Sequence, residues 1–501
     1  MTEKVNKIIY GLGILLLVGV GLIIRFYDLT DAPLDFNSTR QLHSAIIARG
    51  MYYQNLESAP QWQRDVAVRN WTAEGLIEPP ILEALSAMTY RLIGQETLIV
   101  PRVYSIMFWM IGGWFLFLIA RRIAGKYAAL ISLAYFLVLP FGAIASRAFQ
   151  PDPLLTMAII VAWWSMLRWQ QKQTWKRLIL AGTLSGLAIL IKTTAVFFIA
   201  PAWVVLVFAL FSLRRVFTNP QVWTAAVLSI LPYGLFLVYG LFFSGQLASQ
   251  FSLRFFPSLW FDPVWYLQWN GQIRSTVGLE WFLIAFAGSA VIKDKSQRWM
   301  FLSIWLGYFL YGLTLPFHIY THDYYQEPLV PLVALGLAVA ANALFEHFPS
   351  PKWLPTVVVV GVTVYMVVIQ AWDVRVTLAK RGFDNEIIFW TQFGDHLGHD
   401  KKVEGLTQDY GYRLSYYGWV ENSNWITAAD MAYRQLGGIQ IDEDNLFKEQ
   451  TQGKDLFVVT LMDEFERQSK LKDLLNEHYP ILEQKNDYIL YDLRHPIKPL
   501  E

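Results

Sequence analysis

The sequence contains no cysteine and few charged residues. Because cysteine is absent from all 501 positions, disulfides and thiolate metal sites are excluded, and a domain outside the cell would depend on its own core. Charged residues make up 16% of the chain, against about 25% in a typical soluble domain. The formal net charge is +1, so no overall basic or acidic character indicates a nucleic-acid partner. We find no internal repeat and no low-complexity segment.

Hydrophobic residues are abundant instead. They form 54% of the chain, with 21 Trp, 25 Tyr and 33 Phe. This balance, with long uncharged runs, places the protein in a membrane. The aromatic residues suit belts at the two membrane interfaces or a groove for a sugar or a lipid.

The apolar runs approach the roughly 20 residues that a helix needs to cross a bilayer. We predict a mainly α-helical, polytopic transmembrane bundle of about eleven spans. The spans are 8–27, 103–120, 128–146, 153–169, 178–191, 194–213, 222–243, 279–292, 300–317, 329–345 and 354–372.

Basic residues set the orientation. With a cytoplasmic N-terminus, the clusters at 121–126, 172–177, 214–215 and 293–298 all fall inside, as the positive-inside rule demands. The first apolar run lacks an Ala-x-Ala-like cleavage site, so we expect a retained anchor. We expect a multi-pass protein, in the bacterial inner (plasma) membrane, that contacts membrane lipids.

Two domains are expected. Residues 1–372 form the transmembrane domain, with outer loops 28–100, 244–276 and 318–327. Residues 373–501 form a small extracytoplasmic α/β domain. Within it, 455–461 and 487–492 suit strands and 463–479 suits a helix. No glycine-rich phosphate loop stands in this domain, so a structural or acceptor-facing role fits it better.

The segment LDFNSTRQLHSAIIARGMYYQ at 34–54 lies just after the first span. Ser38 is a plausible N-cap for an amphipathic helix, and Arg40 lies on that helix. Asp35 precedes it. Asp35 is either a loop carboxylate that favours the helix start or a catalytic group at the membrane surface.

Asp152 sits in the turn Gln150-Pro151-Asp152-Pro153 between two spans. Turn and cap chemistry alone explains an aspartate there. Alternatively, Asp152 is a second carboxylate on the outer face, where it would orient a base or bind a metal. Arg147, five residues earlier, would pair with it or meet a phosphate.

Lys192 interrupts an apolar stretch, at a cost that needs an explanation. Its ammonium either snorkels to the interface or contacts a lipid phosphate. Glu78-Pro79-Pro80 precedes a second amphipathic helix at 81–93. Glu78 is either part of a simple helix entry or an acid held rigidly near a site.

The turn 318–327 gathers His318, His322, Tyr324 and Tyr325. An aromatic belt with polar caps explains these residues. A metal pair of His318 and His322 is the alternative, since positions four apart share a helix face. The aromatic and basic loop 244–276 suits the headgroup layer or a sugar.

The order of several motifs along the chain resembles the order found in a known family. The motifs are Asp35 before its helix, Glu78-Pro79-Pro80, Arg102, Pro151-Asp152, Lys192 in GLAILIKTT and HDYYQEPLVP at 322–331. Residues 8–372 thereby resemble the polytopic glycosyltransferases with the C-type fold. The nearest groups are the dolichyl-phosphate-mannose protein mannosyltransferase superfamily and the bacterial lipid A aminoarabinose transferase.

The resemblance implies transfer of a sugar from a polyprenyl-phosphate donor to a lipid, glycan or protein acceptor on the outer face. Asp35 would be the catalytic base, Asp152 the second acidic position, and displacement would invert the anomeric carbon. The donor and sugar would contact Arg40, Glu78, Arg102, Arg147, Lys192, His322, Tyr324 and Tyr325. No cofactor is implied as necessary, and a divalent metal stays open.

Two positions depart from the family pattern. Phe36 follows Asp35 where many members have Glu, which leaves one carboxylate and makes a metal at Asp35 doubtful. Glu78 stands where many have Lys or His, so Lys192 and the arginines would take more of the phosphate. The rival interpretations are a transporter or lipid flippase, which would use polar midplane groups and paired repeats, and a non-catalytic membrane scaffold.

Overall fold

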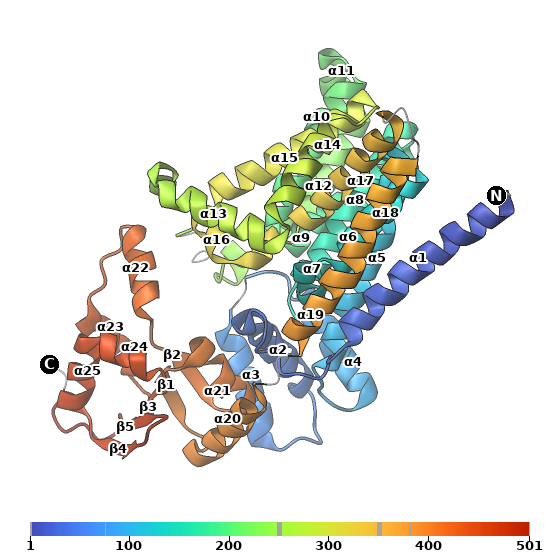
Figure 1. The fold of residues 1–501 in the computed structure, drawn as a ribbon. Coiled ribbons are helices and arrows are strands. Elements are labelled where there is room, and N and C mark those ends of the chain that lie inside the picture. Colours follow the sequence, from blue (N-terminus) through green and yellow to red (C-terminus); the bar gives the residue numbers. More distant parts are fainter. Residues whose placement is uncertain (1–2, 76, 248–252, 348–352, 380–381, 500–501) are drawn as a thin grey trace. The chain divides into compact units, whose positions relative to one another are not determined.

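The computed structural model describes residues 3–75, 77–247, 253–347, 353–379 and 382–499, which fold into two compact units (Figure 1). The first unit comprises Met1–Leu29, Leu76–Leu82 and Pro101–Ala379, and the second Thr30–Gly75, Glu83–Val100 and Lys380–Glu501. Residue 76 of the predicted loop 28–100 and residues 248–252 of the loop 244–276 lie outside the described residues.

The two units group the chain differently from the predicted domains. Most of loop 28–100 belongs to the same unit as the C-terminal segment, whereas the predicted domain 1–372 includes this loop. The domain boundary after residue 372 stays a prediction.

The first unit is built from helices. They are α1 (Glu3–Phe26), α5 (Ile99–Ile123), α6 (Lys126–Val138), α7 (Pro140–Ala145), α8 (Asp152–Gln171), α9 (Trp175–Ile191), η1 (Thr193–Ala195), α10 (Val196–Leu210), α11 (Leu213–Thr218), α12 (Pro220–Val238), η2 (Tyr239–Phe243), η4 (Pro257–Phe261), α13 (Pro263–Thr276), α14 (Leu279–Ala290), α15 (Lys295–Thr314), α16 (Pro316–Thr321), η5 (Asp323–Gln326), α17 (Leu329–His347), α18 (Trp353–Tyr365), η6 (Met366–Gln370) and α19 (Ala371–Leu378). Helix α4 (Ile81–Ile93) begins in this unit and continues in the second.

Among the described residues, five helical segments are long and apolar enough to cross a membrane. They are Lys7–Phe26, Ile99–Ile123, Thr193–Leu210, Pro220–Phe243 and Asp323–His347. The chain is therefore an integral membrane protein, but the predicted count of about eleven spans is not confirmed. One predicted span, 128–146, is split, because Pro140 ends α6 and starts α7.

Small residues let the helices of this unit approach closely. A Cβ atom on Gly186 of α9 would lie 2.1 Å from the carbonyl oxygen of Leu228 in α12, and one on Gly288 of α14 would lie 2.2 Å from that of Gly336 in α17. Glycine is thus required at both crossings, as is common where helices associate in a membrane.

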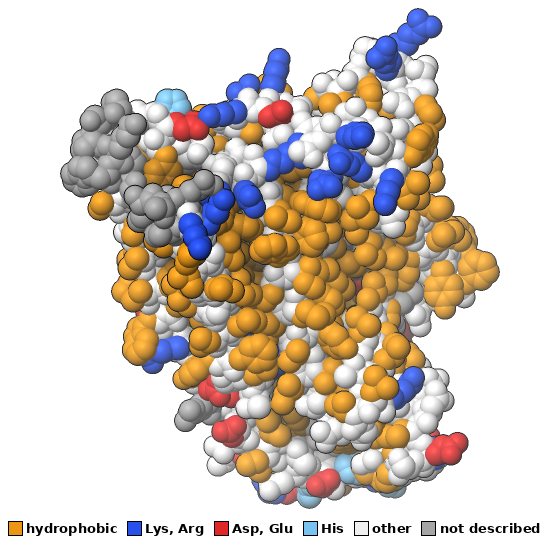
Figure 2. Space-filling model, turned by 90° about the vertical axis from the view of Figure 1, so that its right-hand side faces the viewer, with side chains coloured by type: hydrophobic (Ala, Val, Ile, Leu, Met, Phe, Trp, Pro, Cys, Tyr) orange, Lys and Arg blue, Asp and Glu red, His pale blue; other side chains and the backbone are white. Residues whose placement is uncertain are grey.

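The surface of the helical unit is apolar over a wide area. Figure 2 shows hydrophobic side chains covering the middle of one face, with Lys and Arg side chains gathered near one end. The exposed residues include Leu15, Ile23, Trp114 and Ile230, which are 49–72% exposed. Such a surface suits contact with lipid tails rather than water.

The second unit contains α2 (Ser38–Tyr53), α3 (Gln61–Ala73) and an α/β segment. The elements of that segment are α20 (Asp384–Leu397), β1 (Lys402–Leu406), η7 (Gln408–Gly411), α21 (Tyr412–Tyr417), β2 (Glu421–Asn424), α22 (Ala428–Leu436), α23 (Glu443–Thr451), β3 (Leu456–Val459), α24 (Met462–Arg467), α25 (Ser469–His478), β4 (Ile481–Gln484) and β5 (Ile489–Asp492). The strand order is β2-β1-β3-β5-β4. Strands β2, β1 and β3 are parallel, and β5 runs antiparallel to β3 and β4.

Both faces of this sheet are covered, so its strands alternate between two cores. In β3, Phe457 and Val459 pack with α23, α24 and α25, whereas Leu456 and Val458 pack with α20 and α21. The predicted strands 455–461 and 487–492 contain β3 and β5. The predicted helix 463–479 is two helices, because the chain breaks at Gln468.

Candidate functional site

Lys192 marks a break between two helices of the first unit. Helix α9 ends at Ile191, and Lys192 has an extended backbone (φ −156°, ψ 125°) before η1 begins. The sequence prediction that a charge separates two apolar segments here is confirmed. The side chain does not reach solvent, since Lys192 is only 6% exposed.

Four other predicted site residues surround this lysine. Its Nζ atom donates a hydrogen bond to Asp152 Oδ1 over 2.7 Å and lies 3.8 Å from Glu78 Oε1. The ammonium also faces the rings of Tyr324 and Tyr325, at 5.0 and 5.3 Å from their centroids. We call these five residues the lysine cage.

The lysine cage contains a buried ion pair between Lys192 and Asp152. Asp152 is 1% exposed, and its second oxygen, Oδ2, is buried without a hydrogen-bond partner among the described residues. A buried ion pair needs good geometry to offset its desolvation, and the two tyrosine faces add cation–π attraction. These contacts fix the position of the Lys192 ammonium. An ammonium held in this way acts as a point charge that could bind an anionic group.

Arg102 and Arg147 hold the segment that follows α1. Arg147 Nη1 donates to the carbonyl oxygen of Tyr27 over 2.7 Å, and Arg102 Nη1 donates to that of Leu29 over 2.5 Å. Both arginines are buried. Between these anchor points, Asp28 has a left-handed backbone (φ 51°), which costs free energy in a non-glycine residue. The two guanidinium groups thus stabilise this turn, and their predicted role in binding a substrate stays a prediction.

His318 and His322 lie beside the lysine cage. Their rings are stacked, with centroids 5.8 Å apart, and both rings contact that of Tyr325. Burial, aided by His322, lowers the pKa of His318 to about 3, so His318 is neutral at pH 7. Helix α16 ends at Thr321, so the two histidines do not share a helix.

The described residues were compared with the ligand sets that a metal centre requires. Within the described part of the chain, no group of three or more His, Cys, Asp or Glu side chains could hold a metal ion. The predicted pair of His318 and His322 therefore lacks a third ligand of these types there.

Within the aromatic loop 244–276, Pro257–Phe261 form η4 and Pro263–Thr276 form α13. Trp265 Nε1 donates to the carbonyl oxygen of Pro316, and Trp269 Nε1 donates to the hydroxyl oxygen of Tyr308, over 2.7 and 2.9 Å. Trp265 thereby holds α13 against α16, which carries His318, and Trp269 holds α13 against α15. Phe261 and Leu267, next to and on α13, stay largely exposed.

Asp35 and Arg40 belong to the second unit. Asp35 lies in a bend before α2 and is partly exposed, as is Arg40. The prediction that Ser38 caps this helix is wrong by one residue. Asn37, in the left-handed region (φ 45°), is the cap position, and α2 begins at Ser38.

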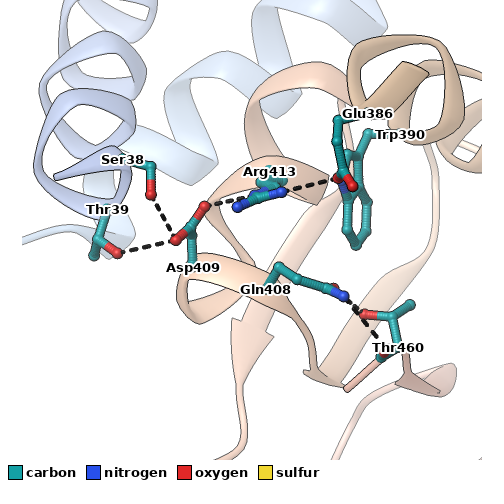
Figure 3. Close-up of polar contacts among 8 residues, drawn as sticks. All are labelled: Ser38, Thr39, Glu386, Trp390, Gln408, Asp409, Arg413 and Thr460. Carbon is teal, nitrogen blue, oxygen red and sulfur yellow. Dashed lines mark hydrogen bonds and ion pairs between the residues drawn. The ribbon is translucent and has the colours of Figure 1, made fainter. Parts of the chain in front are cut away.

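Ser38 has another partner, which fixes the start of α2. Its hydroxyl donates to Asp409 Oδ1 over 2.7 Å, and Thr39 contacts the same oxygen (Figure 3). Arg413 donates to Asp409 Oδ2 over 2.5 Å and to Glu386 Oε2 over 2.8 Å. This network connects the helix that follows Asp35 to the α/β segment within the second unit.

Sequence reasoning missed two groups of buried polar residues. In the second unit, Arg49 Nε lies 3.0–3.1 Å from both carboxylate oxygens of Glu96, and its guanidinium lies over the rings of Tyr416 and Trp419. No signal in the sequence links these distant positions.

The other missed group is in the first unit. Gln150 Nε2 donates to Glu327 Oε1 over 3.0 Å, and both side chains are fully buried. A signal existed for Glu327, since it directly precedes an apolar run, where an ionisable group needs an explanation.

Comparisons with known proteins agree with this architecture. Residues 77–239 match the family model described as dolichyl-phosphate-mannose-protein mannosyltransferase. No curated protein sequence matches the chain.

Several solved structures share the fold. ArnT from Cupriavidus metallidurans, crystallised with undecaprenyl phosphate, superposes with a TM-score of 0.58 at 14% identity, over 96% of this chain and 98% of ArnT. The oligosaccharyltransferase of Archaeoglobus fulgidus, in complex with Zn and sulfate, gives 0.56 at 11% identity, over 96% of this chain and 73% of its own.

These findings favour a membrane glycosyltransferase and give no support to a transporter or lipid flippase. At such identities the structural likeness concerns the fold, while the family match concerns the sequence of residues 77–239. Together they confirm the predicted resemblance: the chain is similar to the polytopic glycosyltransferases with the C-type fold, of the dolichyl-phosphate-mannose-protein mannosyltransferase superfamily.

Proposed function

We propose that this protein transfers a sugar from a polyprenyl-phosphate donor to an acceptor on the extracytoplasmic face of the membrane. The observation that carries the proposal is the lysine cage, in which Lys192 is buried against Asp152 and flanked by Glu78. A buried, oriented ammonium suits a phosphate ester. The crystal structure of ArnT with undecaprenyl phosphate supports a donor of this class.

The proposed setting is a bacterial inner membrane with the N-terminus in the cytoplasm. The concentration of Lys and Arg near one end of the apolar surface (Figure 2) supports this orientation. The outer loops and the C-terminal segment would then face the acceptor.

The donor would bind to both polar and apolar parts of the first unit. Lys192 would take the phosphate, with Tyr324 and Tyr325 beside the sugar. An apolar groove of about 610 Å³, lined by residues of α1, α5 and α6 that include Phe26, Met107 and Trp114, has the chemistry that an isoprenoid tail requires.

Asp35 would act as the general base. Its carboxylate would take the proton of an acceptor hydroxyl as that oxygen bonds to the anomeric carbon. The bond between this carbon and the phosphate oxygen would break on the opposite face, which inverts the configuration. Polyprenyl phosphate would leave as the dianion, with Lys192 offsetting the developing charge.

Mass spectrometry of products tests this function. The purified protein in liposomes is offered polyprenyl-phosphate sugars and a membrane extract, and a glycosylated acceptor is expected. Asp35→Asn should abolish its formation, whereas Asp65→Asn should not, because Asp65 is bonded within its own helix to Gln61. Transfer by Asp35→Asn at the wild-type rate would refute the role of the base. Transport of a labelled solute without any glycosylated product would refute the function.

A further inference from the structure

We propose that Glu327 is a protonated, neutral acid that forms a two-point hydrogen bond with Gln150 and thereby positions Asp152 beside Lys192. The protonation of Glu327 does not depend on the proposed function. The positioning role of Glu327 does rest on the proposed function.

The geometry leaves two acceptors without donors. Gln150 Nε2 donates to Glu327 Oε1 over 3.0 Å, and both residues are 0% exposed. The remaining oxygens, Gln150 Oε1 and Glu327 Oε2, are buried and have no hydrogen-bond partner among the described residues. Buried polar atoms without a partner are costly and need an explanation.

A single proton resolves both deficits. An amide oxygen and an ionised carboxylate are acceptors only, whereas a protonated carboxyl has one O–H donor. With its proton on Oε2, Glu327 would donate to Gln150 Oε1 while it accepts from Gln150 Nε2. The two planar groups would then form a closed pair in which each supplies one donor and one acceptor.

The surrounding charges favour the same state. The charged groups that act on Glu327 are Asp152, Lys192 and Asp323. Lys192, the one cation of the three, is already bonded to Asp152 at 2.7 Å and flanked by Glu78 at 3.8 Å. With no donor bound, an ionised Glu327 would be a further buried carboxylate around a single ammonium, and a buried charge without its own counter-charge is strongly unfavourable.

The pair joins the starts of two helices. Gln150 lies two residues before Asp152, the first residue of α8. Glu327 lies two residues before α17 and two after Tyr325. The Gln150–Glu327 pair therefore sets the distance between the carboxylate and the aromatic side of the lysine cage. Glu327 is a positioning residue, since it would act through Asp152.

Infrared spectroscopy of the full-length protein in D₂O and H₂O tests the proton. At pH 9, where Glu404 is ionised, the wild type is expected to show a carboxylic-acid C=O band that Glu327→Gln removes. The control Glu483→Gln should leave this band intact, because that partly exposed carboxylate is bonded to Lys485 and holds no proton. Loss of an ionised-carboxylate band in Glu327→Gln would overturn the proposal.

Matched substitutions give a second measurement. Toward Gln150, a Gln side chain presents one donor and one acceptor, as a neutral acid does. Glu327→Gln should therefore keep a melting temperature close to that of the wild type. Glu327→Leu, which leaves Gln150 without a partner, should lower it by several degrees. A fall in melting temperature in Glu327→Gln as large as in Glu327→Leu would contradict a neutral pair.

Sugar transfer should fall several-fold in Glu327→Leu and be largely rescued in Glu327→Gln. If the wild type transfers no sugar, the proposed function fails. The infrared and melting results still decide whether Glu327 is protonated.

Discussion

Lys192 donates a hydrogen bond of 2.7 Å to the Oδ1 atom of Asp152, 40 positions earlier in the chain. The bond joins the end of α9 to the start of α8, and both side chains are buried. Helices α8 and α9 are consecutive and packed against one another, so the pair lies at one end of their interface. A buried charge pair within apolar helices costs free energy, so it is expected to have a function or to hold other groups in place.

Removal of one partner of this pair should be strongly destabilising. Asp152→Asn keeps the shape of the side chain but leaves the Lys192 ammonium without its closest carboxylate, at a cost of about 3–5 kcal/mol. We expect a lower melting temperature in detergent and loss of sugar transfer.

A double substitution separates charge from shape. Asp152→Asn combined with Lys192→Met removes both charges, so it should recover much of the stability lost in Asp152→Asn alone without recovering transfer. A double variant as unstable as the single one would show that the ion pair is not the cause.

Arg49 should be a major stabilising residue of the second unit. Its guanidinium bonds to Glu96 and lies over the rings of Tyr416 and Trp419, 3.8 and 4.0 Å from their centroids. Arg49→Lys retains the charge but loses the planar stacking. We expect Arg49→Lys to lower the melting temperature, and Arg49→Met to lower it further, with a loss of about 3 kcal/mol or more.

Arg69→Met is the matched control for Arg49. Arg69 also pairs with a carboxylate, that of Glu421, but its side chain is 42% exposed. Exposed pairs contribute about 0–1 kcal/mol, so this variant should melt near the wild type. Equal losses in Arg49→Met and Arg69→Met would refute the importance of burial.

Glu404 should make the stability of the second unit depend on pH. Burial raises the pKa of this carboxyl to about 7, although Ser423 and Lys454 oppose the shift. Because the folded-state pKa is raised, the stability that Glu404 contributes is present below its unfolded-state pKa and lost as pH rises through about 7. Glu404→Gln cannot ionise, so its melting temperature should fall less than that of the wild type between pH 5 and pH 8.

The size of this effect follows from the shift. A change from 4.5 to about 7 corresponds to roughly 3 kcal/mol at about 1.4 kcal/mol per pKa unit. Glu483→Gln is the control, because hydrogen bonds from Lys485 and His396 lower the pKa of Glu483 to about 2, and the group does not titrate in this interval. A parallel pH dependence of Glu404→Gln and the wild type would contradict the assignment.

The sequence predicted the members of the lysine cage but not their contacts. Lys192 is visible because it interrupts an apolar run, and Asp152 because it lies between prolines. Their distance depends on how α8 and α9 cross, which side-chain periodicity does not encode. Tyr324 and Tyr325 approach the same ammonium from a segment more than 130 residues further along the chain, and only the packing of the helices brings them there.

Local backbone conformations were harder to predict. Ser38 is a common N-cap residue, but the left-handed Asn37 before it takes the cap position and leaves the Ser38 hydroxyl to bond with Asp409. The break at Pro140 was predictable, since proline lacks the N–H group that a continuous helix needs. Glu327 was overlooked because the polar residues before it suggested an exposed turn, whereas the structure buries it fully.

Asp409 should control the position of the segment that carries Asp35. Its carboxylate accepts bonds from Ser38 and Arg413, and its backbone is left-handed, with φ 51°. Asn tolerates this conformation and retains one acceptor, whereas Ala loses both bonds and is strained there.

We therefore expect Asp409→Asn to lower the melting temperature slightly and Asp409→Ala to lower it by the equivalent of about 2–4 kcal/mol. Hydrogen exchange should locate the effect, with faster exchange at the first amides of α2 in Asp409→Ala and little change in the amides of β5. Transfer by Asp409→Ala should fall more than its folded fraction does, because the helix start that follows the base is released. Unchanged exchange at α2 would show that Ser38 and Thr39 do not depend on this carboxylate.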